Sequence, residues 1–369
     1  MGKKLLFVAS SGVHIRNFHL PYLAALKEAG WDIHVACAGS EGLEAHGARV
    51  TELPFEKKLL STQNLKAARI LRRIIKEDNI QALILHTSLA ACFGRLALLG
   101  LPKRPRVVNV VHGYLFDDDS PLIKRFAYLG VERLLAPVTD LVMTMNRWDE
   151  ICAKKHRLAK AVESIDGMGV NFSWLDGQKS GDPETLRREL GLVPTDFVLL
   201  YPGEFSRRKS QIFLLKTLEL LPDEVKLVLP GQGVLLEECR RYAEKRGIAH
   251  RIRFPGAVTQ VGRYYEMADV LVSASRSEGL PFAVMEAMYF GLPVVVSRVK
   301  GHEDLIRNEE NGLLYPYGDP ETCAACIRSV MEDRDRAAAM KRQASIDAQR
   351  YSLERVFPQV MKRYMDILE

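Results

Sequence analysis

The chain has 369 residues, about twice the usual size of one domain, so we expect two domains of comparable size. Hydrophobic residues make up 47% and charged residues 27%, which is ordinary for a globular protein with sizeable cores. The net charge of +6 is too small to indicate a nucleic-acid binder, but it would suit anionic substrates or an anionic membrane surface.

The six cysteines are scattered, and their usage fits a reducing compartment. Only Cys323 and Cys326 form a C-x-x-C, and no second pair completes a four-ligand zinc site, so we expect a core-facing helix there. The N-terminal run KKLLFVAS is too short for a signal sequence, and no segment approaches the ~20 apolar residues that span a bilayer. We therefore expect a cytoplasmic protein whose contact with a membrane, if any, is peripheral.

In the first half, short apolar runs alternate with amphipathic stretches. A loop over 10–18 follows the first strand, and helices are expected over 20–29 and 65–79. Strands that alternate with helices predict a mostly parallel, doubly wound sheet. The expected strands of this half are 5–10, 33–38, 50–55, 82–87, 107–112 and 141–146.

The pattern loosens over 166–183, which is rich in Gly and Asp and is expected to be a linker. A second series of strands follows, and the tail from about Asp333 is helical and charged, with a break expected at Pro358. We predict two Rossmann-like α/β domains that face a cleft, residues 1–170 and 184–345, and a tail, 346–369, that packs back toward the first. The strands expected in the second half are 197–203, 226–231, 252–258, 270–275 and 293–297.

Ligands of open α/β sheets sit beyond the carboxyl ends of the strands, and one such loop stands out. After strand 270–275 the chain reads SEGLPFAVMEAMYF, in which Pro281 suits the start of a helix. Free N–H groups near 280–283 would form an anion site suited to a diphosphate. Glu278 precedes this helix and Glu286 lies inside it, and a carboxylate can accept two hydrogen bonds from a vicinal diol. Either glutamate alone would be an ordinary surface acid; the constellation favours a nucleotide-sugar site.

Glu278 to Glu286 resembles the E-x7-E pattern of the family 4 retaining glycosyltransferases, which have the two-domain GT-B fold. The downstream GLPVVVSRVKGHEDLIRNEENGLLYPYGD also resembles that family, and the resemblance extends over nearly the whole chain. FHLPYLAALKEAGWDIHVAC, VVHGYLF and YPGEFSRRKSQ resemble bacterial members that build exopolysaccharide or capsule. E-x7-E alone would be a weak signal, but its flanks make it specific.

The resemblance implies roles for the residues of this loop. Glu286 would bind the ribose hydroxyls and Glu278 would lie near the hexose. The backbone at Gly279, Leu280 and Pro281 would lie by the diphosphate. Pro281 has no N–H to offer, so Phe282 and the residue after it would donate theirs.

Arg207, Arg208 and Lys209 place three cations in the loop after strand 197–203, where they could neutralise the diphosphate. Lys209 matches the phosphate-binding lysine of the family. Many members have Arg where this chain has Glu204, so the second cation is open between two neighbours, and Arg207 is our choice. The alternative is a solvated basic loop.

Several glycines and one valine are expected to line the donor pocket. Gly203 and Gly231 end the expected strands 197–203 and 226–231. The G-x-G at 231–233 fails as a dinucleotide fingerprint, because a third glycine and an acidic residue after the next strand are missing. By resemblance, the backbone at Val258 lies beside a uracil or similar base. Gly12 stands where backbone must approach the donor phosphate or the acceptor closely.

His112 ends strand 107–112 and directly precedes Gly113. It matches the HG of the family, where the histidine helps to orient donor and acceptor. The neighbouring His14 and His19 are expected to be structural. Asp117–Asp119 could suggest the D-x-D metal site of the other large glycosyltransferase fold, but they lie in a loop, where a solvated acidic turn is the simpler interpretation. We expect no required metal and no cofactor.

We therefore expect a hexosyl- or N-acetylhexosaminyltransferase that uses a nucleotide-sugar, with Glu278, Lys209 and His112 as the catalytic group. The acceptor would be a saccharide, linked to polyprenyl diphosphate as the resemblance implies, and reached at the inner face of a membrane. Basic residues of the first half, including those of ARILRRII at 68–75, could meet that membrane or form a solvated face. A nucleotide-sugar 2-epimerase and a non-catalytic sugar-nucleotide-binding module remain alternatives. The missing fingerprint disfavours a nicotinamide oxidoreductase.

Overall fold

The computed structural model describes residues 2–368, and the chain divides into two compact units. Unit 1 comprises Met1–Gly169 together with Arg355–Glu369, and unit 2 comprises Val170–Glu354. The expected tail is thus shared: its first part lies in unit 2, and the residues from Arg355 onward lie in unit 1. Each unit has its own parallel sheet covered by helices, so the two-domain α/β prediction is confirmed.

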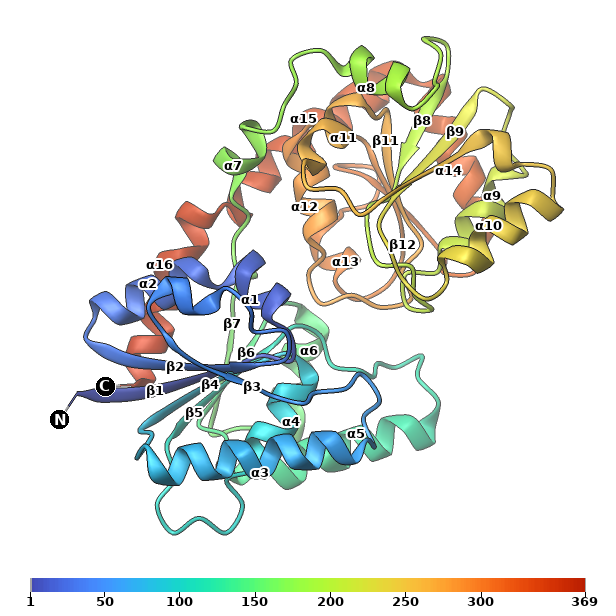
Figure 1. The fold of residues 1–369 in the computed structure, drawn as a ribbon. Helices are drawn as coiled ribbons and strands as arrows, with labels where there is room; N and C mark the ends of the chain where they lie inside the picture. Colours follow the sequence, from blue (N-terminus) through green and yellow to red (C-terminus); the bar gives the residue numbers. More distant parts are fainter. Residues whose placement is uncertain (1, 369) are drawn as a thin grey trace. The chain divides into compact units, whose positions relative to one another are not determined.

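Unit 1 contains seven parallel strands in the order β3-β2-β1-β4-β5-β6-β7 (Figure 1). Its central strands are continuous apolar runs because helices cover both faces; all five residues of Ala82–His86 are buried. The strands are β1 (Lys3–Val8), β2 (Trp31–Cys37), β3 (Arg49–Glu52), β4 (Ala82–His86), β5 (Arg106–Val111), β6 (Leu141–Thr144) and β7 (Ala161–Ser164).

Helices of unit 1 pack apolar stripes on this sheet. In α3 (Thr62–Glu77), Ala67, Leu71 and Ile75 enter a core shared with β1 and β4. The others are α1 (Gly12–Phe18), α2 (Leu20–Glu28), α4 (Ser88–Leu96), α5 (Leu122–Leu135), α6 (Arg147–His156) and α16 (Leu353–Leu368). Short 3-10 turns occupy Leu43–His46 and Ala136–Val138.

Unit 2 contains six parallel strands in the order β10-β9-β8-β11-β12-β13. They are β8 (Phe197–Leu200), β9 (Val225–Pro230), β10 (Ile252–Gly256), β11 (Val270–Ser273), β12 (Val294–Ser297) and β13 (Leu313–Tyr315). The helices are α7 (Phe172–Asp176), α8 (Pro183–Glu189), α9 (Gln211–Leu218), α10 (Leu236–Lys245), α11 (Val261–Met267), α12 (Phe282–Tyr289), α13 (His302–Leu305), α14 (Pro320–Glu332) and α15 (Arg334–Ala348). Short 3-10 turns occupy Ala249–Arg251 and Gln349–Tyr351.

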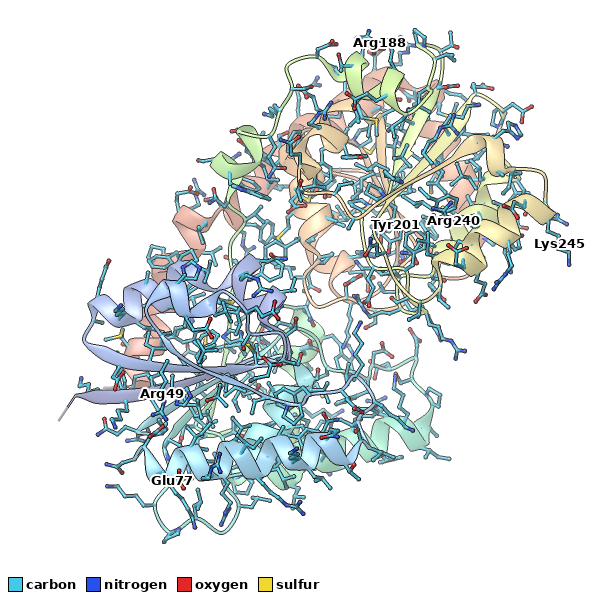
Figure 2. The ribbon with its side chains drawn as sticks, viewed as in Figure 1. Arg49, Glu77, Arg188, Tyr201, Arg240 and Lys245 are labelled. Atoms are coloured by element: carbon cyan, nitrogen blue, oxygen red, sulfur yellow. The ribbon has the colours of Figure 1, made fainter. Side chains whose placement is uncertain are left out.

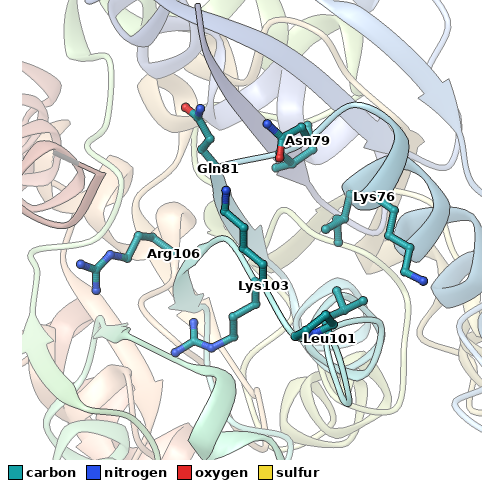
Figure 3. A pocket seen from close by; sticks show the side chains of 10 residues that line it. Lys76, Asn79, Gln81, Leu101, Lys103 and Arg106 are labelled. Atoms are coloured by element: carbon teal, nitrogen blue, oxygen red, sulfur yellow. The ribbon is translucent and has the colours of Figure 1, made fainter. Parts of the chain in front are cut away.

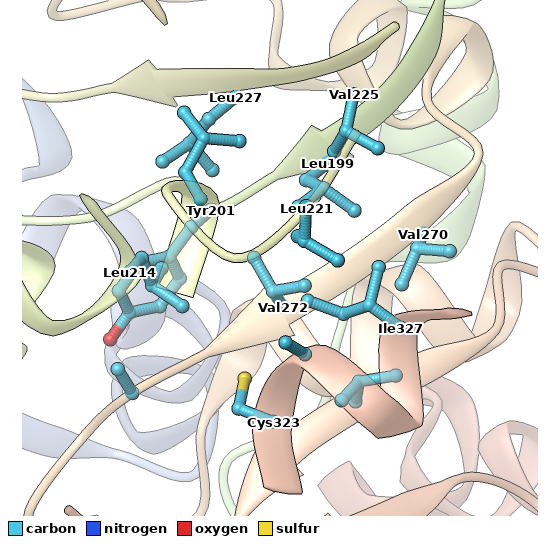
Figure 4. Packing of buried hydrophobic residues seen from close by; sticks show 14 of the residues in the cluster. Leu199, Tyr201, Leu214, Leu221, Val225, Leu227, Val270, Val272, Cys323 and Ile327 are labelled. Carbon is cyan, nitrogen blue, oxygen red and sulfur yellow. The ribbon is translucent and has the colours of Figure 1, made fainter. Parts of the chain in front are cut away.

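One large apolar core holds the strands of unit 2 against α9, α10 and α14 (Figure 4). Cys323 is fully buried in it and Cys326 packs against it, which confirms the core-facing prediction for this pair. Phe254 packs against this core, and the guanidinium of Arg240 on α10 (labelled in Figure 2) lies 5.0 Å from the centre of its ring.

Two local predictions are wrong. Residues 12–18 form the helix α1 instead of a loop. The expected linker does contain the boundary between the units, but its residues from Val170 onward belong to unit 2 and include α7, capped by Asn171. Within unit 2 the Phe172 and Tyr289 rings stack with their centres 3.9 Å apart. Pro358 lies inside a continuous α16; the interruption comes earlier, at the extended Ser352 between α15 and α16.

Candidate functional site

The predicted donor loop forms at the carboxyl end of β11, as the sequence indicates. Pro281 is the N-cap residue of α12, so Glu278 lies in the preceding loop and Glu286 lies within the helix. β8 pairs with β11 in the sheet, and this pairing brings the loop after β8 beside the loop after β11. The link between them is direct, because the backbone N–H of Arg276 donates to the carbonyl of Arg208 at 2.8 Å.

Glu278 is buried and is held by three side chains. Arg208 Nη1 lies 2.5 Å from Oε2, Lys209 Nζ lies 2.8 Å from Oε1, and the Ser275 hydroxyl donates to Oε1 at 2.5 Å. Burial raises the pKa of the Glu278 carboxyl, but the charges of Lys209 and Arg208 outweigh it and hold the pKa well below the range of an ordinary glutamate. Glu278 is therefore a permanent carboxylate that can accept hydrogen bonds but cannot deliver a proton.

The basic loop provides two of its three cations to this cluster. Arg208 and Lys209 both pair with Glu278, whereas Arg207 is exposed and pairs with no side chain among residues 2–368. The structure thus brings Lys209 to Glu278 as expected, and it brings Arg208, not the Arg207 that we chose. Burial lowers the pKa of Lys209, but the charge of Glu278 raises it more, so the ammonium stays charged.

Glu286 has a different environment. Its Oε2 accepts a hydrogen bond of 2.6 Å from the Tyr265 hydroxyl on α11. Burial raises the pKa of Glu286, and the hydrogen bond from Tyr265 opposes this rise. The two glutamates of the pattern are therefore distinct chemically, one fixed as an anion by cations and one held by a phenol.

The predicted glycines lie where loops meet. A Cβ at Gly231, which has φ of 149°, would come 1.9 Å from the carbonyl oxygen of Gly203, so the loops after β8 and β9 are in backbone contact. Gly12 in unit 1 meets the carbonyl of Gly39 in the same way, at 2.0 Å. These contacts explain the glycines by packing, and their roles toward a ligand stay predictions. Val258 is half-buried in the loop after β10, and Leu280 and Pro281 are buried while Phe282 is half-buried.

Other residues near the pattern were not predicted. Tyr201 at the end of β8 shares a hydrogen bond of 2.7 Å with Ser275 and donates to the Lys209 carbonyl at 3.1 Å. The buried His302 at the start of α13 interacts electrostatically with Glu278. The downstream stretch that resembles the family contains this histidine, which could have been singled out, whereas only the fold brings in Tyr201 and Tyr265.

His112 follows β5 in unit 1 and meets three other histidines, with His86 Nδ1 3.0 Å from its Nε2. Two carboxylates of the expected acidic turn, Asp117–Asp119, contact other side chains of the protein. Asp118 pairs with Arg125 at 2.8 Å and accepts a hydrogen bond of 2.7 Å from the Trp148 indole, and Asp117 accepts one from the Ser120 hydroxyl.

A separate cavity of about 350 Å³ lies in unit 1 at the amino ends of β4 and β5, whereas His112 lies at the carboxyl end of β5 (Figure 3). Lys76, Lys103 and Arg106 line it, and none of the predicted donor residues does. Arg104 also lines it, and its Nη1 lies 2.7 Å from Oδ2 of Asp140.

Comparison with known proteins gives two family matches along the chain. Residues 17–150 match the glycosyl transferase 4-like domain, and residues 182–346 match the glycosyl transferases group 1. The chain is 29% identical to the putative glycosyltransferase EpsD of Bacillus subtilis (strain 168), over 100% of this chain and 98% of the relative. It is 25% identical to a UDP-Gal:alpha-D-GlcNAc-diphosphoundecaprenol alpha-1,3-galactosyltransferase of Escherichia coli, covering 87% of this chain and 85% of that protein. Among solved structures, HepE of Anabaena in complex with UDP and glucose superposes with a TM-score of 0.78 over 99% of this chain and 100% of that chain, at 21% identity.

Proposed function

This chain is a glycosyltransferase with the GT-B fold, and we propose that it moves a sugar from a UDP-sugar to a saccharide acceptor with retention at the anomeric carbon. The observation that carries the proposal is the pairing of Glu278 with Lys209 and Arg208. It gathers a carboxylate for sugar hydroxyls and two cations for a diphosphate at one sheet edge. The choice of UDP is supported by HepE, which has been solved with UDP and with UDP-glucose.

The proposed reaction breaks the bond between the anomeric carbon and the donor phosphate oxygen. The acceptor hydroxyl oxygen forms the new bond on the same face, and its proton passes to the leaving phosphate. Lys209 and Arg208 would stabilise the charge that develops on that phosphate. No metal is required in this scheme, because the two cations serve as the electrophilic partner.

The environments of the two glutamates favour binding roles over acid–base roles. The depressed pKa of Glu278 makes it a poor base and keeps it available as an acceptor for the hexose hydroxyls. Glu286, which already accepts from Tyr265, would take the ribose hydroxyls on its remaining lone pairs. His112 of unit 1 would orient donor and acceptor.

A screen of the purified chain against UDP-, GDP- and ADP-sugars tests this function. We expect UDP-sugars to raise the melting temperature, and we expect Glu286→Ala to remove that shift. Product analysis with and without a saccharide acceptor then separates the activities: a free epimerised sugar without acceptor would indicate a 2-epimerase, and binding without turnover a non-catalytic module. No shift with any sugar nucleotide would contradict the proposal.

We further propose that the acceptor is a lipid-linked saccharide of surface polysaccharide assembly, met at the inner face of a membrane. The relative from Escherichia coli is named for a diphosphoundecaprenol-linked acceptor. No helix among residues 2–368 is long and apolar enough to cross a bilayer, so contact would be peripheral.

The surface that fits this contact is on α5, not on the basic helix α3. Leu122, Ile123, Phe126 and Leu134 are 69%, 87%, 70% and 61% exposed. At about 100° per residue they form one stripe, in which the exposed Arg133 also falls, while the exposed Lys124 lies on the neighbouring flank of the helix. Exposed apolar residues flanked by cations suit the interface of an anionic bilayer. By contrast, the apolar face of α3 is buried, and Arg72 donates to the carbonyls of Ala97 and Leu99.

Vesicle co-sedimentation tests this surface with phosphatidylglycerol and with phosphatidylcholine. We expect binding to the anionic vesicles, weakened at least ~10-fold by the double variant Ile123→Ser and Phe126→Ser. Leu60→Ser, at a position that is 90% exposed elsewhere in unit 1, is the matched control and should bind like wild type. Loss of binding in Lys66→Gln with Arg69→Gln, but not in the α5 variant, would assign the contact to α3 instead.

A further inference from the structure

Four of the nine histidines of the chain meet inside unit 1. His14 lies on α1 and His19 follows that helix, while His86 ends β4 and His112 follows β5. One ring nitrogen from each lies within 4.8 Å of one from every other. They gather at the carboxyl ends of β1, β4 and β5, where the strand order changes direction and where α/β sheets bind ligands.

The cluster contains nitrogens that no protein group satisfies. His19 is fully buried, and neither of its ring nitrogens has a hydrogen-bond partner among residues 2–368; the Nε2 of His14 also has none. Buried polar groups are normally paired, so unpaired nitrogens that face one another call for an explanation. Thr87, directly after His86, has φ of 72°, an unusual conformation for a β-branched residue that is typical of functional sites.

We propose that His14, His19, His86 and His112 bind one borderline divalent transition metal ion, of which Zn²⁺ is the type. Zinc takes four ligands at about 2.0 Å, which places tetrahedral nitrogens about 3.3 Å apart. The His86 Nδ1 and His112 Nε2 pair, 3.0 Å apart, is already close to that spacing. The remaining distances between the ring nitrogens would shorten by rotation of the two half-buried rings, His14 and His112.

Tyr364 provides the outer contact that such sites usually have. Its hydroxyl, on α16, lies 3.2 Å from His86 Nε2. Coordination through Nδ1 leaves an N–H at Nε2 that donates to this oxygen and fixes the ring. Because all four ligands are imidazoles and none is a carboxylate, the site selects Zn²⁺, Co²⁺ or Ni²⁺ over the hard ions Mg²⁺, Ca²⁺ and Mn²⁺. This site lies in unit 1, apart from the predicted donor residues of unit 2, and it shares His112 with the proposed function. The ion itself takes part in no step of the proposed reaction.

Cobalt titration of the metal-depleted, tag-free full chain tests the site. We expect one equivalent of Co²⁺ to bind with the visible spectrum of tetrahedral coordination, Zn²⁺ to displace it, and Mg²⁺ to have no effect. His19→Phe and His14→Ala should each weaken binding by more than ~100-fold, and Tyr364→Phe by ~10-fold. His34→Gln, which removes another buried histidine of unit 1, is the matched control and should bind like wild type.

The outcomes separate the proposal from its competitor, a stack of neutral rings joined by the His86–His112 hydrogen bond. Absence of a tetrahedral spectrum in the folded wild type overturns the metal site, and so does equal binding by His14→Ala and wild type. Circular dichroism checks that each variant folds. If His19→Phe does not fold, His14→Ala at the half-buried position provides the test in its place. The readout is binding, so it stands apart from any failure of the proposed transferase activity.

Discussion

Arg208 and Lys209 are neighbours in the sequence, yet both reach the same carboxylate. Ser210, which follows them at the start of α9, adopts a left-handed conformation with φ of 54°. The sequence identified Lys209 and Glu278 but favoured Arg207 as the second cation, because neighbouring residues of a loop cannot be told apart without the conformation of that loop. Tyr265 was out of reach for another reason: it meets Glu286 only through the packing of α11.

Substitution of the three cations one at a time tests which of them serve the donor. We expect Lys209→Ala to lower kcat by ~100- to 1,000-fold and Arg208→Ala by ~10- to 100-fold, because each removes a charged donor from the leaving diphosphate. Arg207→Ala should cost less than ~3-fold. Steady-state kinetics measures all three, with Lys245→Ala on α10 as the charge control. A larger loss of kcat for Arg207→Ala than for Arg208→Ala would support Arg207 as the second cation, as the sequence analysis proposed.

At the scale of elements, every strand predicted from an apolar run was found, and the central strands have the continuous apolar composition of strands buried on both faces. The two that were missed, β7 and β13, are edge strands of three or four residues. The polar GVHIRNF of α1 buries only Gly12 and Ile15, so it lacks the periodicity that would have predicted a helix. α16 continues through the exposed Pro358, and Val356, Val360 and Tyr364 on its other face are fully buried.

Asp140 joins several elements of unit 1, and its removal has a predictable dependence on pH. Its carboxylate holds Arg104, Lys160 and the backbone N–H of Val107 at the start of β5. Burial raises its pKa, but these partners outweigh burial and lower the pKa to about 2. A depressed pKa in the folded state gives stability that is present above the unfolded value near 3.8 and is lost as the pH falls toward 2.

Asp140→Asn should therefore lower the free energy of unfolding of unit 1 by about 2 kcal/mol at pH 7. The difference from wild type should shrink as the pH falls below 4. Urea unfolding of both proteins across this range measures it. A difference that stays constant with pH would mean that packing, not charge, accounts for the loss.

At the scale of the whole molecule, each unit has a core of its own, and the predicted donor residues Lys209, Glu278 and Glu286 all belong to unit 2. We predict that residues 170–354 alone fold and bind UDP, while they transfer no sugar, because His112 and the expected acceptor residues are missing. Calorimetry with UDP measures this, and the same fragment with Glu286→Ala is the control. A folded fragment that binds no UDP, although the full chain does, would show that unit 1 contributes to donor binding.

The division of the chain also bears on how it is made. Unit 2 is an uninterrupted segment, whereas unit 1 needs α16, which supplies Tyr364 to His86 and Arg363 to Glu163. On the ribosome, these residues emerge only after all of unit 2 has been synthesised. The first unit can therefore complete its fold only after the whole of unit 2 has left the ribosome.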